Sequence, residues 1–214
     1  MLGYKRNQVD EAISLTVGAR GQEIGKLQIT VKRLLVSDRR HHEKTKGRKG
    51  NYAFFSDRPP GSGVEVLFSA YEGFSILVGL KLLEHGLPQA RVVSVMTEVR
   101  PQLEPAYADT LKKDPEALFD QRAVLAQARP GMIATDNTDP VFLAFIRLPG
   151  ESLREGKRNS PIAVCRGHYE LNAFTKKWCI PGYGMTYFEL VRLMHVFADN
   201  LSKVPPVKRG RGAS

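Results

Sequence analysis

The chain has 214 residues, with 32 Lys and Arg against 22 Asp and Glu, so its formal net charge is +10. This length gives one large domain or two small ones, with enough core to fold without disulfide or metal staples. No apolar run approaches the ~20 residues of a membrane span, and the start of the chain has no signal-peptide core. We therefore expect a cytoplasmic protein without a membrane partner, and the two cysteines, Cys165 and Cys179, are typical of a reducing interior.

The positive charge is concentrated towards the two ends of the chain. Residues 1–50 hold 12 Lys and Arg against 5 Asp and Glu, residues 51–128 hold 7 against 10, and residues 129–214 hold 13 against 7. Basic ends of this kind attract a polyanion such as nucleic acid through counterion release. Solvated surface lysines are the alternative explanation for any one cluster.

Two helices are expected at the N-terminus. The first covers residues 4–17, with Asn7 as its N-cap, and Gly18 and Gly21 interrupt the pattern before helical spacing resumes over residues 22–37. The inner side of the second helix carries Ile24, Leu27, Val31, Leu34 and Leu35. Its other side carries residue types that reach phosphates and base edges, namely Lys26, Gln28, Thr30, Lys32 and Arg33. Such a helix can enter a major groove, although an ordinary amphipathic helix has the same pattern.

A basic polar segment over residues 37–50 is predicted to be a loop. Its cations are Arg39, Arg40, Lys44, Lys46, Arg48 and Lys49. His41 and His42 have no nearby partner at metal-ligand spacing, so we interpret them as part of this loop.

The loop leads into two strand-like runs, residues 51–58 and 64–69, on either side of a Pro-Pro-Gly-Ser-Gly turn. They predict a β-hairpin, and Arg58 adds a cation at its turn. Two helices, a basic loop and a small hairpin indicate a winged-helix domain, with one helix in the major groove and the wing and loop on the phosphate backbone.

An αα-hairpin is expected to follow over residues 64–103. Ser69 and Glu72 have the spacing of a capping box, and the first of the two helices should end at Gly86. Pro88 suits the first turn of the second helix, and Pro101 is expected to end it.

The order of these elements resembles the DNA-binding domain of the MerR family. The resemblance covers roughly residues 4–103 and is carried by FSAYE (68–72), LKLLEHGLP (80–88) and VVSVM (92–96). It implies that the helix 22–37 reads the groove and that the loop up to residue 58 contacts the DNA backbone. We therefore expect a MerR-like winged-helix domain over residues 1–103.

The second half of the chain predicts a smaller mixed α/β domain over residues 131–204, reached through a linker, residues 104–130, with a helix at 115–128. The run PVFLAFIRL is typical of a buried strand, and residues 160–178 supply one or two more strands. A last helix should begin at Thr186, with Glu189 three residues later as in a capping box. The basic tail, residues 205–214, is expected to be disordered and to add phosphate contacts.

Motifs for catalysis are incomplete. His168 and Glu170 match the H-x-E of zinc deaminases, but the P-C-x-x-C that this chemistry needs is missing. Neither a phosphate-binding G-K-[ST] nor a G-x-S-x-G elbow occurs. We therefore expect no enzyme activity, no catalytic residue, no cofactor and no metal.

Together these patterns predict an α+β protein that acts as a transcription regulator binding specific double-stranded DNA sequences. We expect a homodimer, because twofold symmetry doubles the few base contacts of one small module. The C-terminal domain would either hold the dimer together or bind a small-molecule effector, and the sequence leaves both open. The alternative function is a non-catalytic RNA-binding or protein-interaction module.

Overall fold

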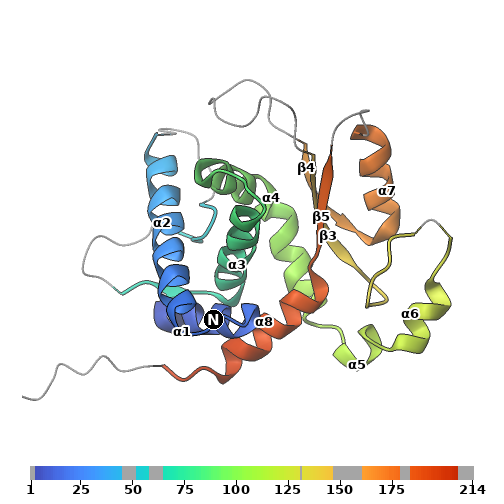
Figure 1. Ribbon diagram of the computed structural model, residues 1–214, viewed down its shortest axis with the longest axis horizontal. Helices are drawn as coiled ribbons and strands as arrows, with labels where there is room; N and C mark the ends of the chain where they lie inside the picture. The colour runs from blue at the N-terminus through green and yellow to red at the C-terminus, as the bar shows by residue number, and fades with distance from the viewer. Residues whose placement is uncertain are drawn as a thin grey trace, which may run out of the picture. The chain divides into compact units, whose positions relative to one another are not determined.

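The computed structural model describes residues 3–44, 52–57, 65–130, 132–146, 161–178 and 184–206. These residues form an α+β structure with two small antiparallel sheets and a majority of helix, and Figure 1 labels the helices and the strands of the larger sheet. It divides into two compact units, residues 1–98 with 196–214 and residues 99–195. Among the helices described, none has the length and apolar content to cross a membrane.

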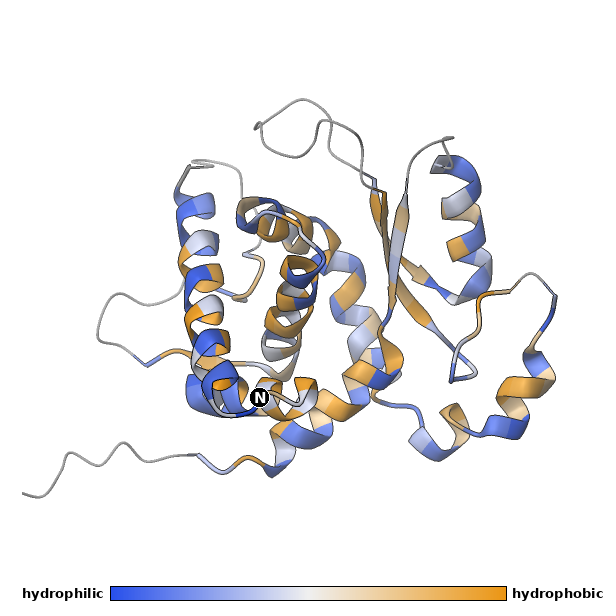
Figure 2. Ribbon diagram, in the orientation of Figure 1, coloured by the Kyte–Doolittle hydropathy of each residue, from blue (hydrophilic) through white to orange (hydrophobic). Residues whose placement is uncertain are grey.

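The first unit is built around the buried helix α3 (Ala70–Glu84). Most of its residues are buried, which makes it a core helix rather than an amphipathic one, and it is largely orange in Figure 2. The other elements of the unit are β1 (Tyr4–Lys5), α1 (Arg6–Val17), α2 (Gln22–Lys44), β2 (Leu67–Phe68), the start of α4 (Gln89–Thr110) and the end of α8 (Val191–Lys203).

Both ends of the chain belong to this first unit. The Phe197 side chain on α8 is fully buried, and its ring centroid lies 6.1 Å from that of Phe74 on α3. The Gln8 side chain donates a buried hydrogen bond of 2.8 Å to the carbonyl oxygen of Val204. The last described residues therefore complete the core that the first ones begin.

The expected β-hairpin wing is wrong for the described residues. Residues 52–57 form no strand, and β2 pairs instead with β1 from the N-terminus, with Tyr4 opposite Phe68. The physical reason is that backbone donors of the segment 52–57 are taken by side chains of α2 and α3, which leaves them unavailable to a ladder. The predicted turn, residues 59–63, lies outside the described residues.

The helix α2 is longer than predicted. It continues to Lys44, so residues 37–44 are helical and not a polar loop. The segment 52–57 covers the inner side of this extension, where Asp38 is buried and the His42 ring contacts the Tyr52 ring in a tilted arrangement, with centroids 4.0 Å apart. Packing of the segment 52–57 against residues 37–44 therefore favours helix where the sequence alone predicts a loop.

The αα-hairpin is confirmed in its first half. Ser69 caps α3, its hydroxyl accepts the Glu72 N–H, and Glu72 accepts the Ser69 N–H in return. Gly86 follows the helix with a φ of 82°, a value that glycine adopts without strain. The expectation that Pro101 ends α4 is wrong, because the helix continues to Thr110. Burial of the neighbouring apolar residues outweighs the lost N–H donor, and they are Val99, Leu103, Ala106 and Tyr107.

The second unit contains a three-stranded sheet in the order β4-β3-β5. Its central strand β3 (Val141–Ile146) is buried throughout, which confirms the buried strand predicted there. β4 (Ile162–Arg166) and β5 (Met185–Glu189) flank β3, both antiparallel to it. One face of the sheet packs against α7 (Gly167–Trp178) through Phe142, Cys165, Leu171 and Phe174.

Three expectations for this unit are corrected. The helix predicted at 115–128 is two short helices, α5 (Pro115–Leu118) and α6 (Gln121–Gln127), because the Asp120 side chain caps a new start. Residues 167–178 form a helix where a further strand was allowed. Thr186 lies in β5 and caps nothing, because Glu189 accepts the Val191 N–H at 2.9 Å and starts α8 there.

A glycine on α3 allows close packing in the first unit. A Cβ at Gly73 would lie 2.9 Å from Cζ of the buried Phe197 ring, and the ring has no solvent-facing space into which to move. Gly25, on an exposed part of α2, has nothing within 4 Å of the same position.

We expect Gly73→Ala to lower the free energy of unfolding by about 1 kcal/mol, because overpacking costs about 1–3 kcal/mol and helix propensity returns less than that. Gly25→Ala should instead raise it by about 0.5–1 kcal/mol. Urea denaturation of both variants measures the difference. Equal stabilisation by the two substitutions would contradict the packing described here.

Candidate nucleic-acid interface

The helices α1 and α2 form a helix–turn–helix with a four-residue turn, residues 18–21. Gly18 and Gly21 have φ values of 70° and 53°, the left-handed region in which glycine is favoured. The Gly18 N–H donates to the Leu15 carbonyl and the Ala19 N–H to the Ser14 carbonyl, as in a Schellman motif. The two glycines thus fix the direction in which α2 leaves α1.

A cation braces the two helices. Arg6 on α1 forms an ion pair with Asp10 and also donates a hydrogen bond of 3.2 Å to the Gln28 carbonyl oxygen on α2. Burial raises the pKa of Asp10, and the nearby Arg6 guanidinium opposes that shift. The Arg6 side chain therefore makes its contacts within the helix–turn–helix.

The inner side of α2 is defined by four buried residues, Val31, Leu34, Leu35 and Asp38. This confirms the apolar side predicted for most of the helix. Ile24 is an exception, because it is 36% exposed and does not belong to the core.

The opposite side of α2 presents a stripe that we call the outer stripe: Ile29, Arg33, Val36 and Arg40. At about 100° per residue these four fall within a narrow arc opposite Val31 and Leu34. All four side chains are exposed, with Ile29 at 54% and Val36 at 38%. From Ile29 to Arg40 the stripe runs about 16 Å along the helix.

Four cations on and beside the outer stripe have no acidic partner among the described residues. Within the described parts of the chain, the side chains of Lys26, Lys32, Arg33 and Arg40 are exposed and form no ion pair. Their charge is therefore available to an anion in solution.

The other residues predicted for the groove are less well disposed. Gln28 and Thr30 lie about 160° apart around the helix, so they cannot both face one groove. The Thr30 hydroxyl also donates to the Lys26 carbonyl oxygen at 2.9 Å. The Arg39 guanidinium lies over the Phe55 ring, 5.5 Å from its centroid, and its Nε is buried. Arg39 thus packs inward, which corrects its assignment to the basic loop.

Several predicted DNA-binding residues fall outside the described side chains. Lys44 is the last residue of α2, and its side chain lies outside the description, as do Lys46, Arg48, Lys49 and Arg58. Sequence reasoning missed Ile29 and Val36, although their seven-residue spacing, out of phase with the inner residues, could have indicated them.

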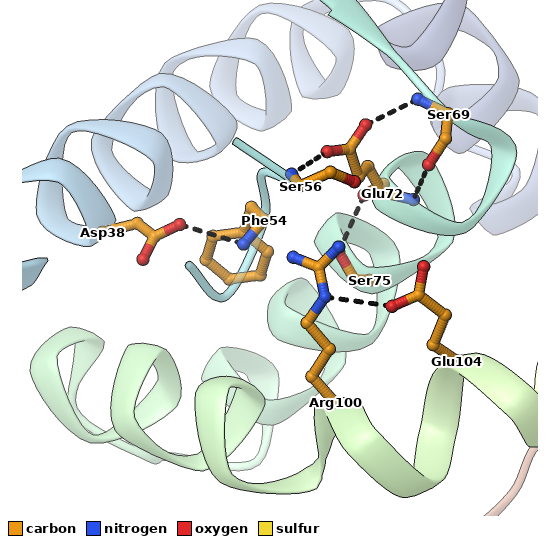
Figure 3. Close-up of polar contacts among 8 residues, drawn as sticks. All are labelled: Asp38, Phe54, Ser56, Ser69, Glu72, Ser75, Arg100 and Glu104. Carbon is orange, nitrogen blue, oxygen red and sulfur yellow. Dashed lines mark hydrogen bonds and ion pairs between the residues drawn. The ribbon is translucent and has the colours of Figure 1, made fainter. Parts of the chain in front are cut away.

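The segment 52–57 is held between α2 and α3 by two buried carboxylates (Figure 3). Asp38 accepts the N–H groups of Ala53 and Phe54 at 3.1 and 2.9 Å. Glu72 accepts the Ser56 N–H as well as the Ser69 N–H of its own cap. This anchored segment lies in sequence between the basic residues 44–49 and Arg58.

The second unit has a pocket of about 520 Å³ between the C-terminal half of α4, the strand β4 and α7. The Gln102 side chain accepts the Val164 N–H there at 3.4 Å, and Glu170 accepts the Arg166 N–H at 2.7 Å. Burial raises the pKa of the Cys165 thiol to about 11, so it stays protonated at neutral pH and is a poor nucleophile.

No metal cluster was found in the part of the chain that the structure describes. His168, half-buried near the start of α7, has its pKa lowered by burial, and its ring lies against Phe142, with centroids 5.5 Å apart. These are packing contacts, and they give the H-x-E sequence a structural role in α7.

No protein-family model matches this chain, and neither a curated protein nor a solved structure gives a match. The resemblance to the MerR domain therefore stays a prediction from sequence. Function therefore has to be inferred from the geometry and chemistry of the site itself.

The anchored segment gives a test of the site's framework. In Asp38→Asn one carboxylate oxygen becomes an NH₂ group facing a backbone N–H, which leaves a buried donor unsatisfied. We expect the free energy of unfolding to fall by about 1–3 kcal/mol at neutral pH. Asp57→Asn, an exposed change in the same segment, should leave it within about 0.5 kcal/mol. Equal effects of the two changes in urea denaturation would contradict this account.

The difference in stability between wild type and Asp38→Asn should depend on pH. Burial raises the pKa of Asp38, and the N–H groups of Ala53 and Phe54 offset this only in part. The folded pKa thus lies above the unfolded value of about 3.9, so the stability contributed by this carboxyl falls as pH rises through the folded pKa. The advantage of wild type over Asp38→Asn should narrow from pH 4 towards pH 7. A gap that widens with pH would show that the pKa is lowered instead.

Proposed function

We propose that this protein binds double-stranded DNA through the helix–turn–helix formed by α1 and α2, with the outer side of α2 in the major groove. The observation that carries the proposal is the set of four exposed cations around the outer stripe that form no ion pair with any residue the structure describes. A helix with exposed guanidinium and ammonium groups on its solvent side suits a polyanion, and a major groove admits one α-helix.

The turn supports this proposal over a general basic surface. A turn of three or four residues containing glycine is typical of DNA-binding helix–turn–helix motifs. In these motifs the second helix meets the base edges while the first crosses the backbone. The Schellman closure at Gly18 and the Arg6 brace hold α1 and α2 as one body, so binding would not have to order them.

The β-hairpin wing predicted from sequence is not part of this proposal, because residues 52–57 form no strand. The segment 52–57 takes the place of that β-hairpin, and phosphate contacts by the basic residues 44–49 and Arg58 stay a prediction from sequence. We propose that the first unit, residues 1–98 with 196–214, is a divergent MerR-like reader of DNA.

The second unit would serve the regulator by pairing two copies or by binding an effector. Its pocket has a volume within the range of small-molecule sites, roughly 300–1,000 Å³. A homodimer would read two half-sites about one helical turn apart.

Selection of bound sequences from random duplex DNA with the purified full chain tests the proposal. We expect an enriched motif with two related half-sites, because a twofold dimer mirrors its symmetry in the DNA. Enrichment of single-stranded RNA over duplex DNA in a parallel selection, or no enrichment at all, would overturn it in favour of another binding module.

The cations on α2 give a second test. Replacing Lys32 and Arg33 by Ala should weaken binding and reduce the slope of log affinity against log salt by about 0.9 for each phosphate that the variant no longer neutralises. A matched control replaces two exposed cations of the second unit, Arg122 and Lys176, and should leave the slope unchanged. Binding measured by fluorescence anisotropy across salt concentrations decides between them. Equal weakening in the two double variants would mean that net charge alone drives binding.

A further inference from the structure

Two aliphatic side chains interrupt the cations of the outer stripe. Ile29 and Val36 are seven residues apart, and Arg33 lies between them on the same line. Figure 2 shows orange and blue segments interleaved along α2. A single exposed aliphatic residue is ordinary, but here two of them lie at the centre of the side farthest from the core.

The surrounding charge limits what these aliphatic groups can contact. Lys26, Lys32, Arg33 and Arg40 lie around them without ion-pair partners among the described residues. Pairing this stripe with the same stripe of a second copy would bring like charges together at every turn, which disfavours an α2–α2 seam. A partner with anionic groups at its edges and an apolar group at its centre suits the stripe better.

The major groove of DNA has this arrangement. Phosphates line its two edges, and the only apolar group on its floor is the C5-methyl group of thymine. A helix in the groove with Lys26 and Lys32 on its flanks would direct the residues of the outer stripe, both the aliphatic ones and the arginines, to the base edges. Ile29 is the more exposed of the two aliphatic residues and is nearer to the N-terminus of α2, the part of a recognition helix that contacts bases.

We propose that Ile29 is a specificity-determining residue that contacts the C5-methyl group of a thymine in each half-site. This inference rests on the proposed DNA binding and goes beyond it, because it names the base and the chemical group that are read. The contact is apolar, so it should contribute discrimination without changing the salt dependence of binding.

The test uses the selected DNA site, resynthesised with deoxyuridine in place of thymidine at one position at a time. Deoxyuridine differs from thymidine only by the missing methyl group. We expect one position in each half-site at which the exchange weakens wild-type binding about fourfold, the value of one buried methyl group. With Ile29→Ala the exchange at that position should have no effect, because the side chain that touches the methyl group is already absent.

Two variants serve as controls. Leu67→Ala removes an aliphatic side chain of matching exposure, 56% against 54%, elsewhere in the first unit, and should keep the full sensitivity to deoxyuridine. Ile29→Lys adds charge at the same site and should raise general affinity while losing the preference for thymine. Both changes are on the surface, so circular dichroism should show a wild-type fold.

The outcomes separate this inference from the proposed function. If wild type binds no duplex, both fail. If wild type binds but no thymine is sensitive, or Ile29→Ala keeps the sensitivity, the inference is wrong and the DNA-binding proposal stands. If Ile29→Ala changes the mass of the protein in sedimentation, the stripe is an interface between copies and the inference is overturned.

Discussion

The first unit depends on two buried carboxylates that accept backbone N–H groups. Asp38 on α2 and Glu72 on α3 hold the same short segment from two sides, and neither is more than slightly exposed. A buried carboxylate is costly unless hydrogen bonds replace its water, and the segment supplies those donors. In return the carboxylates satisfy backbone groups that have no sheet or helix partner.

These hydrogen bonds fix the segment 52–57 in place, so its aromatic side chains can pack against the neighbouring helices. Tyr52, Phe54 and Phe55 become core residues without belonging to a regular element, and they cover the last turns of α2. The helix can therefore remain helical through a run of charged residues that local propensity leaves undecided. Its inner side is buried through Val31, Leu34 and Leu35, and its outer side is exposed.

The sequence predicts correctly those parts of the fold that depend on residues close together in the chain. The capping box of Ser69 and Glu72, the left-handed Gly86 and the continuous apolar run of β3 were all predictable from neighbouring residues. The hydrogen bonds from Ala53 and Phe54 to Asp38 were not, because they join residues fifteen or sixteen positions apart through a segment without periodicity. Turn composition therefore favoured a hairpin where side-chain acceptors had taken the donors.

Sequence also predicted some residues of the candidate site and missed others. The helical period identified the exposed cations of α2, but alternate residues were grouped as if they shared one side, which placed Gln28 with Thr30 and left out Ile29. Burial of the inner residues corrects this, because the outer stripe is defined by what lies opposite Val31 and Leu34. The strand pairing of Tyr4 with Phe68 was equally out of reach, since two-residue strands carry almost no pattern.

The closure of the first unit by α8 affects how the protein is made. Residues 1–98 are synthesised before Phe197 and Val204. Until then Phe74 lacks its contact with the Phe197 ring, and the Gln8 side-chain amide lacks its carbonyl acceptor. The first unit can therefore reach its final packing only after translation has passed the sheet of the second. A chain that stops before α8 would lack the Phe197 ring beside Phe74 and the Val204 acceptor of Gln8, so its first unit would be left with an unfilled core and an unsatisfied buried amide.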